Sequence, residues 1–127
     1  MIDQEKNNIY KPGKHLLLDF YGAKNLTDLN YIKRALISTA DKCKATVLGV
    51  NFHSFGINKG ITGVIILAES HISIHTWPEI NFVALDVFMC GNCTATDAVE
   101  PLKQFFKPSK TIIKEIARGV INTKEKP

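Results

Sequence analysis

Residues 67–79 read Leu-Ala-Glu-Ser-His-Ile-Ser-Ile-His-Thr-Trp-Pro-Glu, and they gather two histidines, two serines, two carboxylates and the single tryptophan of the chain. The segments on either side, residues 61–67 and 82–89, are apolar enough to be buried strands. An unpaired polar group between buried strands costs about 1–3 kcal/mol, so these side chains must form either a hydrogen-bonded network or a site. The residue types favour a site.

The chain has 127 residues, which is enough for one hydrophobic core and too few for two. Hydrophobic residues make up 45% and charged residues 22%, as in ordinary soluble globular proteins. No apolar run approaches the roughly 20 residues of a membrane helix, and the polar start is unlike a signal peptide. An odd number of cysteines, three, favours reduced thiols. We therefore expect one cytoplasmic domain over residues 1–127, with loose ends at 1–13 and 122–127.

The net charge of +4 comes mainly from scattered lysines, because the chain has only two arginines, Arg34 and Arg118. Nucleic-acid-binding domains usually concentrate Lys and Arg on one face or one helix. The charge pattern therefore indicates a soluble surface, and we expect neither a nucleic-acid partner nor a membrane partner.

Two helices are predicted between the apolar segments. The first follows Thr27 or Asp28, either of which can cap it, and one face carries Leu29, Ile32, Leu36 and Ala40. The second opens near Thr94 or Thr96, ends before Pro108, and carries Val99, Leu102 and Phe106.

Strands are predicted over residues 15–21, 46–53, 61–68, 72–77, 82–89 and 111–117. Strands in this order, with one helix after the first strand and one before the last, are typical of an α+β fold. We expect a two-layer sandwich, a mainly antiparallel sheet with two helices on one face. The other sheet face then needs cover, and a homodimer that stacks sheet on sheet is the expected solution.

The alternation of side chains bears on how the central polar residues could cooperate. In an extended strand His71, Ser73 and His75 share one face, whereas Ile72 and Ile74 share the other. Ser70 and His75 are five residues apart, so an unbroken strand would put them on opposite faces. Cooperation between them would require a break in the strand near residues 69–71. The plain alternative is a turn serine that hydrogen-bonds its own backbone.

Several motifs together resemble the short bacterial and archaeal S-adenosylmethionine decarboxylases. The central ones are Glu69-Ser70-His71, His75-Thr76-Trp77-Pro78-Glu79, and Asp86 followed by Cys90-Gly91. Further matches are Lys14-His15-Leu16, Phe20-Tyr21, and Phe52-His53 with Phe55. The resemblance covers roughly residues 14–118, and the paired motifs ESH and HTWPE at this separation make it specific.

The resemblance implies a self-cleaving enzyme that makes its own pyruvoyl group and needs neither pyridoxal phosphate nor a metal. Ser70 would attack the carbonyl of Glu69, and β-elimination would yield residues 1–69 and a pyruvoyl-blocked fragment 70–127. His75 would be the proton acceptor in this processing. The pyruvoyl ketone would form a Schiff base with S-adenosylmethionine, and Cys90 would donate a proton to the decarboxylated product, which serves spermidine biosynthesis.

The resemblance also implies substrate contacts. Phe55 matches an aromatic ring that stacks on the adenine, and Glu79 matches the acid that accepts both ribose hydroxyls. Asp19 stands where the family commonly has Glu. Thr62 stands where a serine usually supports processing, so slower self-cleavage is possible, and the loop at residues 56–59 is about one residue longer.

Two other functions fit parts of the pattern. Relatives of this family decarboxylate arginine or ornithine, and only Phe55 and Glu79 favour a nucleoside. A zinc module could use His71, His75, Cys90 and Cys93, because Cys90-Gly-Asn-Cys93 has ligand spacing. However, His71 and His75 would lie about 13 Å apart along an extended strand, too far to share one metal.

Overall fold

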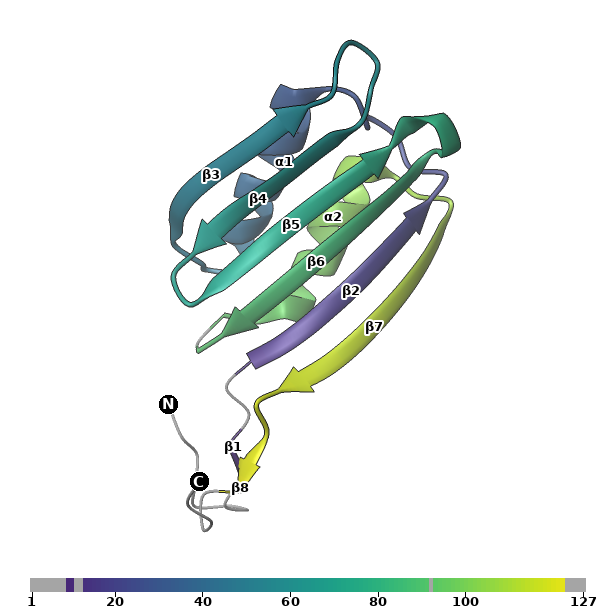
Figure 1. Ribbon diagram of the computed structural model, residues 1–127. Helices are drawn as coiled ribbons and strands as arrows, with labels where there is room; N and C mark the ends of the chain where they lie inside the picture. The colour runs from purple at the N-terminus through teal and green to yellow at the C-terminus, as the bar shows by residue number, and fades with distance from the viewer. Residues whose placement is uncertain (1–8, 11–12, 92, 123–127) are drawn as a thin grey trace.

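The computed structural model describes residues 9–10, 13–91 and 93–122. Its main layer is a six-stranded sheet in the order β3-β4-β5-β6-β2-β7, in which every neighbouring pair is antiparallel. The strands are β2 (Gly13–Tyr21), β3 (Val47–Ser54), β4 (Ile61–Leu67), β5 (Ser70–Trp77), β6 (Phe82–Cys90) and β7 (Lys110–Arg118). Both helices lie on the same face of this sheet, so the predicted α+β sandwich is confirmed (Figure 1).

The two α-helices form the second layer, and their ends follow local chemistry. Helix α1 (Leu29–Lys42) begins after Asp28, whose carboxylate accepts a hydrogen bond from the Tyr31 amide at 3.0 Å. Helix α2 (Val99–Phe106) is preceded by a short 3-10 helix, η2 (Ala95–Ala98), and ends at Lys107 in the left-handed region. The helices bury residues such as Leu36, Leu102 and Phe106 against the sheet. Among the described residues, no helix is long and apolar enough to cross a membrane.

The strands divide their side chains strictly between the two sheet faces. Those on the helix side form the core, and most are fully buried: Leu16, Leu18, Phe20, Ile65, Ile72, Ile74, Val83 and Val87. The opposite face, which we call the open face, carries polar groups mixed with exposed apolar residues, including Leu17, Ile66, Trp77, Ile112 and Ile116. Within residues 9–10, 13–91 and 93–122 no helix or strand packs over this face.

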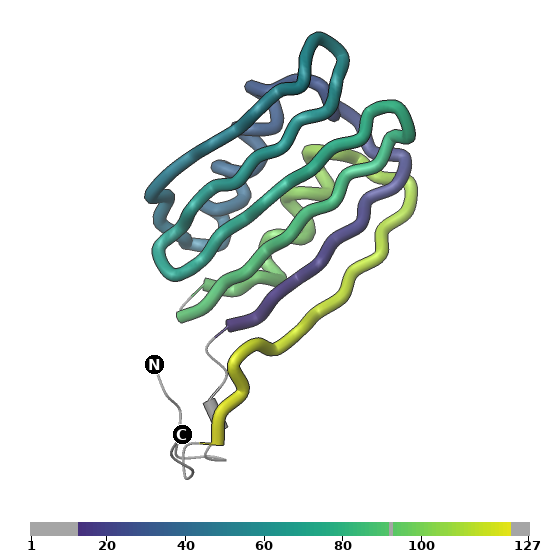
Figure 2. Tube along the Cα trace, in the orientation of Figure 1, coloured from purple at the N-terminus to yellow at the C-terminus, as the bar shows by residue number. Residues whose placement is uncertain are grey.

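The connections place different segments at the two ends of the sheet. The β4–β5 turn and the end of β6 lie at one end, whereas the β3–β4 loop and the β5–β6 connection, which contains η1 (Pro78–Ile80), lie at the other (Figure 2). A separate two-stranded ladder pairs β1 (Ile9–Tyr10) with β8 (Ile121–Asn122). This ladder includes residues from both terminal segments that we expected to be loose, 1–13 and 122–127. The residues of those segments that the structure does not describe are 1–8, 11–12 and 123–127.

Candidate active site

One group of site residues meets where β4 turns into β5. Ala68 and Glu69 form a two-residue turn between the paired residues Leu67 and Ser70, and Glu69 takes a φ of 62°. A residue other than glycine held at such a φ stores strain of about 1–3 kcal/mol. The strained residue is the one whose carbonyl carbon Ser70 is expected to attack. The resemblance thus puts the scissile bond at a turn that the sheet holds on both sides.

Cys90, the last residue of β6, contacts both sides of that bond. Its Sγ donates to the Glu69 carbonyl oxygen at 2.5 Å, and its backbone N–H donates to Ser70 Oγ at 3.4 Å. The Ser70 Oγ and Cys90 Sγ atoms are 4.0 Å apart. Ser70 is 8% exposed, and its hydroxyl bonds across to β6 rather than to its own turn. We call Glu69, Ser70 and Cys90 the cleavage end.

A second group meets at the other end of the sheet. The Oγ1 of Thr62 and the Nδ1 of His75 are 3.2 Å apart, on directly paired residues of β4 and β5. They line a pocket of about 390 Å³ together with Phe55, Lys59, Gly60, Thr76, Trp77 and Glu79. Phe55 is 63% exposed there, so its ring is free to take a planar ligand. We call Phe55, Thr62, His75 and Glu79 the binding end.

The structure does not bring the two ends together within one chain. Strand β5 runs unbroken from Ser70 to Trp77, so the break that cooperation between Ser70 and His75 would require is absent. Ser70 lies on the helix side and His75 on the open face, and five residues of strand span about 16 Å. Within one copy His75 therefore cannot reach the Ser70 hydroxyl.

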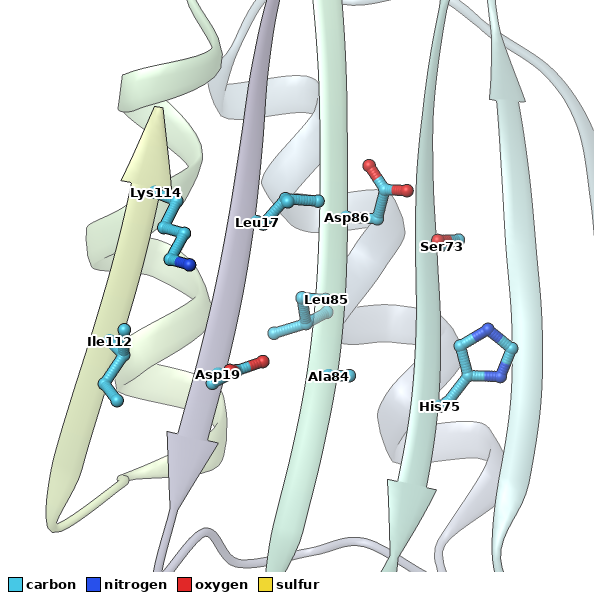
Figure 3. A pocket seen from close by; sticks show the side chains of 9 residues that line it. All are labelled: Leu17, Asp19, Ser73, His75, Ala84, Leu85, Asp86, Ile112 and Lys114. Atoms are coloured by element: carbon cyan, nitrogen blue, oxygen red, sulfur yellow. The ribbon is translucent and has the colours of Figure 1, made fainter. Parts of the chain in front are cut away.

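Asp19, the remaining predicted substrate contact, lies on the open face beside the binding end. With His75 it lines a hollow of about 360 Å³, together with Leu17, Ser73, Ala84, Leu85, Asp86, Ile112 and Lys114. Figure 3 shows these side chains coming from β2, β5, β6 and β7. His75 lines both cavities, so Asp19 shares a surface with the binding end and not with Ser70.

A family model described as S-adenosylmethionine decarboxylase matches residues 14–119, which contain both ends of the site. The chain belongs to the S-adenosylmethionine decarboxylase family. A relative from Methanococcus maripaludis (strain C5), named S-adenosylmethionine decarboxylase proenzyme, is 42% identical over 116 residues, which are 89% of this chain and 94% of the relative. A proenzyme of the same name from Thermodesulfovibrio yellowstonii is 40% identical over 117 residues, covering 90% and 86%.

A solved structure agrees with this assignment. The crystal structure of the adenosylmethionine decarboxylase from Aquifex aeolicus VF5 matches with a TM-score of 0.82 and 28% identity, covering 92% of this chain and 98% of that one. The resemblance seen in the sequence is thus confirmed at the level of family and fold.

The open face also carries a network of polar side chains to which the sequence analysis assigned no role. Asp86 of β6 accepts from His15 Nε2 of β2, and its Oδ1 lies 3.9 Å from His71 Nε2 of β5. Arg118 Nη1 lies 2.9 Å from His15 Nδ1. Because a guanidinium only donates, His15 Nδ1 must accept and the ring proton sits on Nε2. The sequence signal that could have indicated this network is a polar residue at every second position of an otherwise apolar strand.

The network also bears on the zinc alternative. Among the described residues, the group close enough to hold a metal is His15, His71 and Asp86, whose ligand atoms lie within 4.8 Å of one another. The set proposed from spacing, His71, His75, Cys90 and Cys93, does not assemble. In the tautomer that these partners imply, His15 Nε2 carries a proton toward Asp86, so hydrogen bonds account for this group.

Proposed function

We propose that this chain is a proenzyme that cuts itself between Glu69 and Ser70 and then decarboxylates S-adenosylmethionine with a pyruvoyl group at position 70. Its product would be the aminopropyl donor for polyamine biosynthesis. Support comes from the family, from relatives named as proenzymes, and from the geometry of the cleavage end. The expected cytoplasmic location stays a prediction.

The observation that carries the proposal is the hydrogen bond from Cys90 Sγ to the Glu69 carbonyl at 2.5 Å. A donor on that oxygen polarises the carbonyl and stabilises the negative charge that forms when Ser70 Oγ attacks the carbon. The attack breaks the Glu69–Ser70 amide and forms an ester. Release of the strained φ of Glu69 would favour the reaction.

The second step removes the α-proton of residue 70 and expels the Glu69 carboxylate. Residue 70 becomes dehydroalanine, which takes up water and loses ammonia to give the pyruvoyl group. The fragments 1–69 and 70–127 would stay together, because β4 and β5 remain paired from Thr62–His75 to Leu67–Ser70. Cleavage would thus free the new group without unfolding the sheet.

The pyruvoyl group, once formed, supplies a ketone that condenses with the substrate amine and accepts electrons as CO₂ leaves. Cys90 would return a proton to the α-carbon, since its Sγ lies 4.0 Å from Ser70 Oγ, which is bonded to the Cβ atom that would become the methyl carbon of the pyruvoyl group. For the substrate's nucleoside, the binding end offers an exposed ring at Phe55 and a carboxylate at Glu79. Asp19 would complete the polar lining.

The active enzyme would be a homodimer, because neither end of the site is complete alone. His75 lies about 16 Å from Ser70 on the opposite face, so a processing base for Ser70 must come from elsewhere. A second copy packed on the open face would bring its own His75 and Glu79 to the face that carries Cys90, which contacts both Glu69 and Ser70. That face carries exposed apolar side chains that a partner sheet could bury: Leu17, Ile66, Trp77, Ile112 and Ile116.

An arginine or ornithine decarboxylase of the same chemistry is less well supported. Those substrates have no ribose diol and no adenine, and would leave Glu79 and Phe55 without partners. The named relatives are S-adenosylmethionine decarboxylases.

The decisive measurement is the intact mass of the denatured protein, purified without substrate. We expect two fragments divided between Glu69 and Ser70, the second without a free N-terminal amine. Ser70→Ala should remain one uncut, inactive chain, whereas Ser38→Ala on helix α1 should cut normally. A cut and active Ser70→Ala protein would end the proposal.

A further inference from the structure

A backbone hydrogen bond joins Cys93 to Cys90, the last residue of β6. The Cys93 N–H donates to the Cys90 carbonyl at 3.4 Å, and Gly91 takes a φ of 69°. Residues three apart that are joined by such a hydrogen bond have Cα atoms within about 7 Å of each other, and a disulfide needs about 4.4–6.8 Å. The hydrogen bond therefore brings two cysteines to bonding range, one of them at the cleavage end.

Each of the two thiols donates to a backbone carbonyl of another segment. Cys90 Sγ donates to the Glu69 carbonyl and Cys93 Sγ donates to the Lys44 carbonyl at 3.5 Å. Both side chains are partly exposed, and all three cysteines of the chain are free thiols. A bond between the two sulfurs would replace both of these contacts.

The third cysteine is a poor competitor for either thiol. Cys43 is 2% exposed at the end of α1, and burial, with smaller contributions from Asp97 and Cys93, raises its pKa to about 11. The thiolate is the form that attacks a disulfide, so Cys43 would react slowly. Oxidation should therefore begin at Cys90 or Cys93.

We propose that Cys90 and Cys93 form a reversible disulfide that withdraws the Cys90 thiol from the active site. The oxidant is a low-molecular-weight disulfide. One cysteine thiolate attacks it and releases one thiol, and the second cysteine displaces the other. Two protein thiols lose two protons and two electrons, and the reagent is reduced to two thiols. A dithiol reverses the exchange.

The effect on activity rests on the proposed function, whereas bond formation does not. In the cleaved enzyme the disulfide removes the proton that Cys90 donates to the product. In the uncut chain it removes the hydrogen bond to the Glu69 carbonyl, so self-cleavage should slow as well. This differs from a thioredoxin-like activity, because the protein is the target of the exchange and not its catalyst.

The test exposes the cleaved enzyme to buffers of increasing oxidised over reduced glutathione, then blocks free thiols in acid and maps the peptides by mass. We expect a Cys90–Cys93 cross-link and at least a tenfold loss of decarboxylation that dithiothreitol restores. Cys93→Ser should have wild-type activity when reduced and should accumulate a mixed glutathione disulfide on Cys90 instead. A Cys43–Cys93 link, a link between two copies, or a lasting glutathione adduct on wild-type Cys90 would overturn the proposal.

The uncut Ser70→Ala chain separates this inference from the function. If it forms the Cys90–Cys93 link, the disulfide stands whether or not the protein decarboxylates anything. If wild type is cleaved and active but forms no link at any glutathione ratio, the function stands and the disulfide proposal fails.

Discussion

The two ends of β5 differ in almost every physical respect. At the cleavage end Ser70 is 8% exposed, its hydroxyl and the Glu69 carbonyl are both hydrogen-bonded by Cys90, and the backbone is strained. At the binding end Phe55 is 63% exposed and the pocket of about 390 Å³ stands open. Covalent rearrangement needs atoms held in place, whereas the binding end must admit a ligand and, in our proposal, a second chain.

The largest expected effect tests whether the two ends meet between copies. Ser70→Ala and His75→Ala should each be inactive alone. Co-expressed in equal amounts, half of the dimers are mixed, and each mixed dimer has one site with both changes and one with neither. We therefore expect about a quarter of wild-type activity, from the two-fold symmetry of the dimer. Activity and the mass of each chain provide the measurement.

In the mixture only the His75→Ala chain should be cut, because only that chain has Ser70 facing an intact His75. Native mass should show that both variants dimerise. Folded mixed dimers that neither cut nor react would contradict a site shared between chains. Efficient cutting of His75→Ala by itself would remove His75 from the role of base.

The sequence pointed to candidate residues at both ends of β5 but not to the distance between them. Alternation along residues 70–77 correctly placed His75 and Ser70 on opposite faces of an extended strand, and β5 is such a strand. The family motifs imply that the two residues cooperate, and within a single chain the only solution was a break near Glu69. Residue patterns within one chain carry no information about a second copy, so the conflict could be seen but not resolved.

The fold could be predicted from the pattern of apolar residues that become buried. The polar network on the open face could not be predicted in this way. Strand positions followed from apolar alternation, and Asp28 caps α1 as expected. His15, Asp86 and Arg118 come from three strands 32 to 103 residues apart, so their contact depends on the strand order β6-β2-β7. Nothing local in the sequence specifies that order.

Cys90→Ala tests whether the cleavage end serves two reactions. A proton donor contributes about 10²- to 10⁴-fold, so decarboxylation should fall by about that factor. Self-cleavage should also slow, because the Glu69 carbonyl loses its donor, but it should still reach completion. Single-turnover kinetics and a cleavage time course measure the two effects. Cys93→Ala under reducing conditions is the matched control, and unchanged kinetics in Cys90→Ala would remove its thiol from the mechanism.

Glu79→Gln tests the binding end alone. A hydrogen bond to a charged group contributes about 1.5–3 kcal/mol, so the KM for S-adenosylmethionine should rise roughly 10- to 100-fold. Self-cleavage should be unchanged, because the base proposed for that reaction is His75 and not Glu79. Glu100→Gln, on helix α2, is the control with the same change of charge. Equal KM values for both variants would favour a substrate without a ribose, such as arginine.

Thr62 gives the smallest effect and tests how the binding end supports cleavage. Its Oγ1 lies 3.2 Å from His75 Nδ1, and a hydrogen bond of this kind contributes about 1 kcal/mol. Thr62→Ala should therefore slow self-cleavage about fivefold, whereas Thr62→Ser keeps the hydroxyl and should cut at least as fast as wild type. The appearance of the fragment 70–127 from freshly translated chain measures both rates. If Thr62→Ala cuts as fast as Thr62→Ser, His75 needs no partner on β4, and its orientation must come from the pairing of the strands.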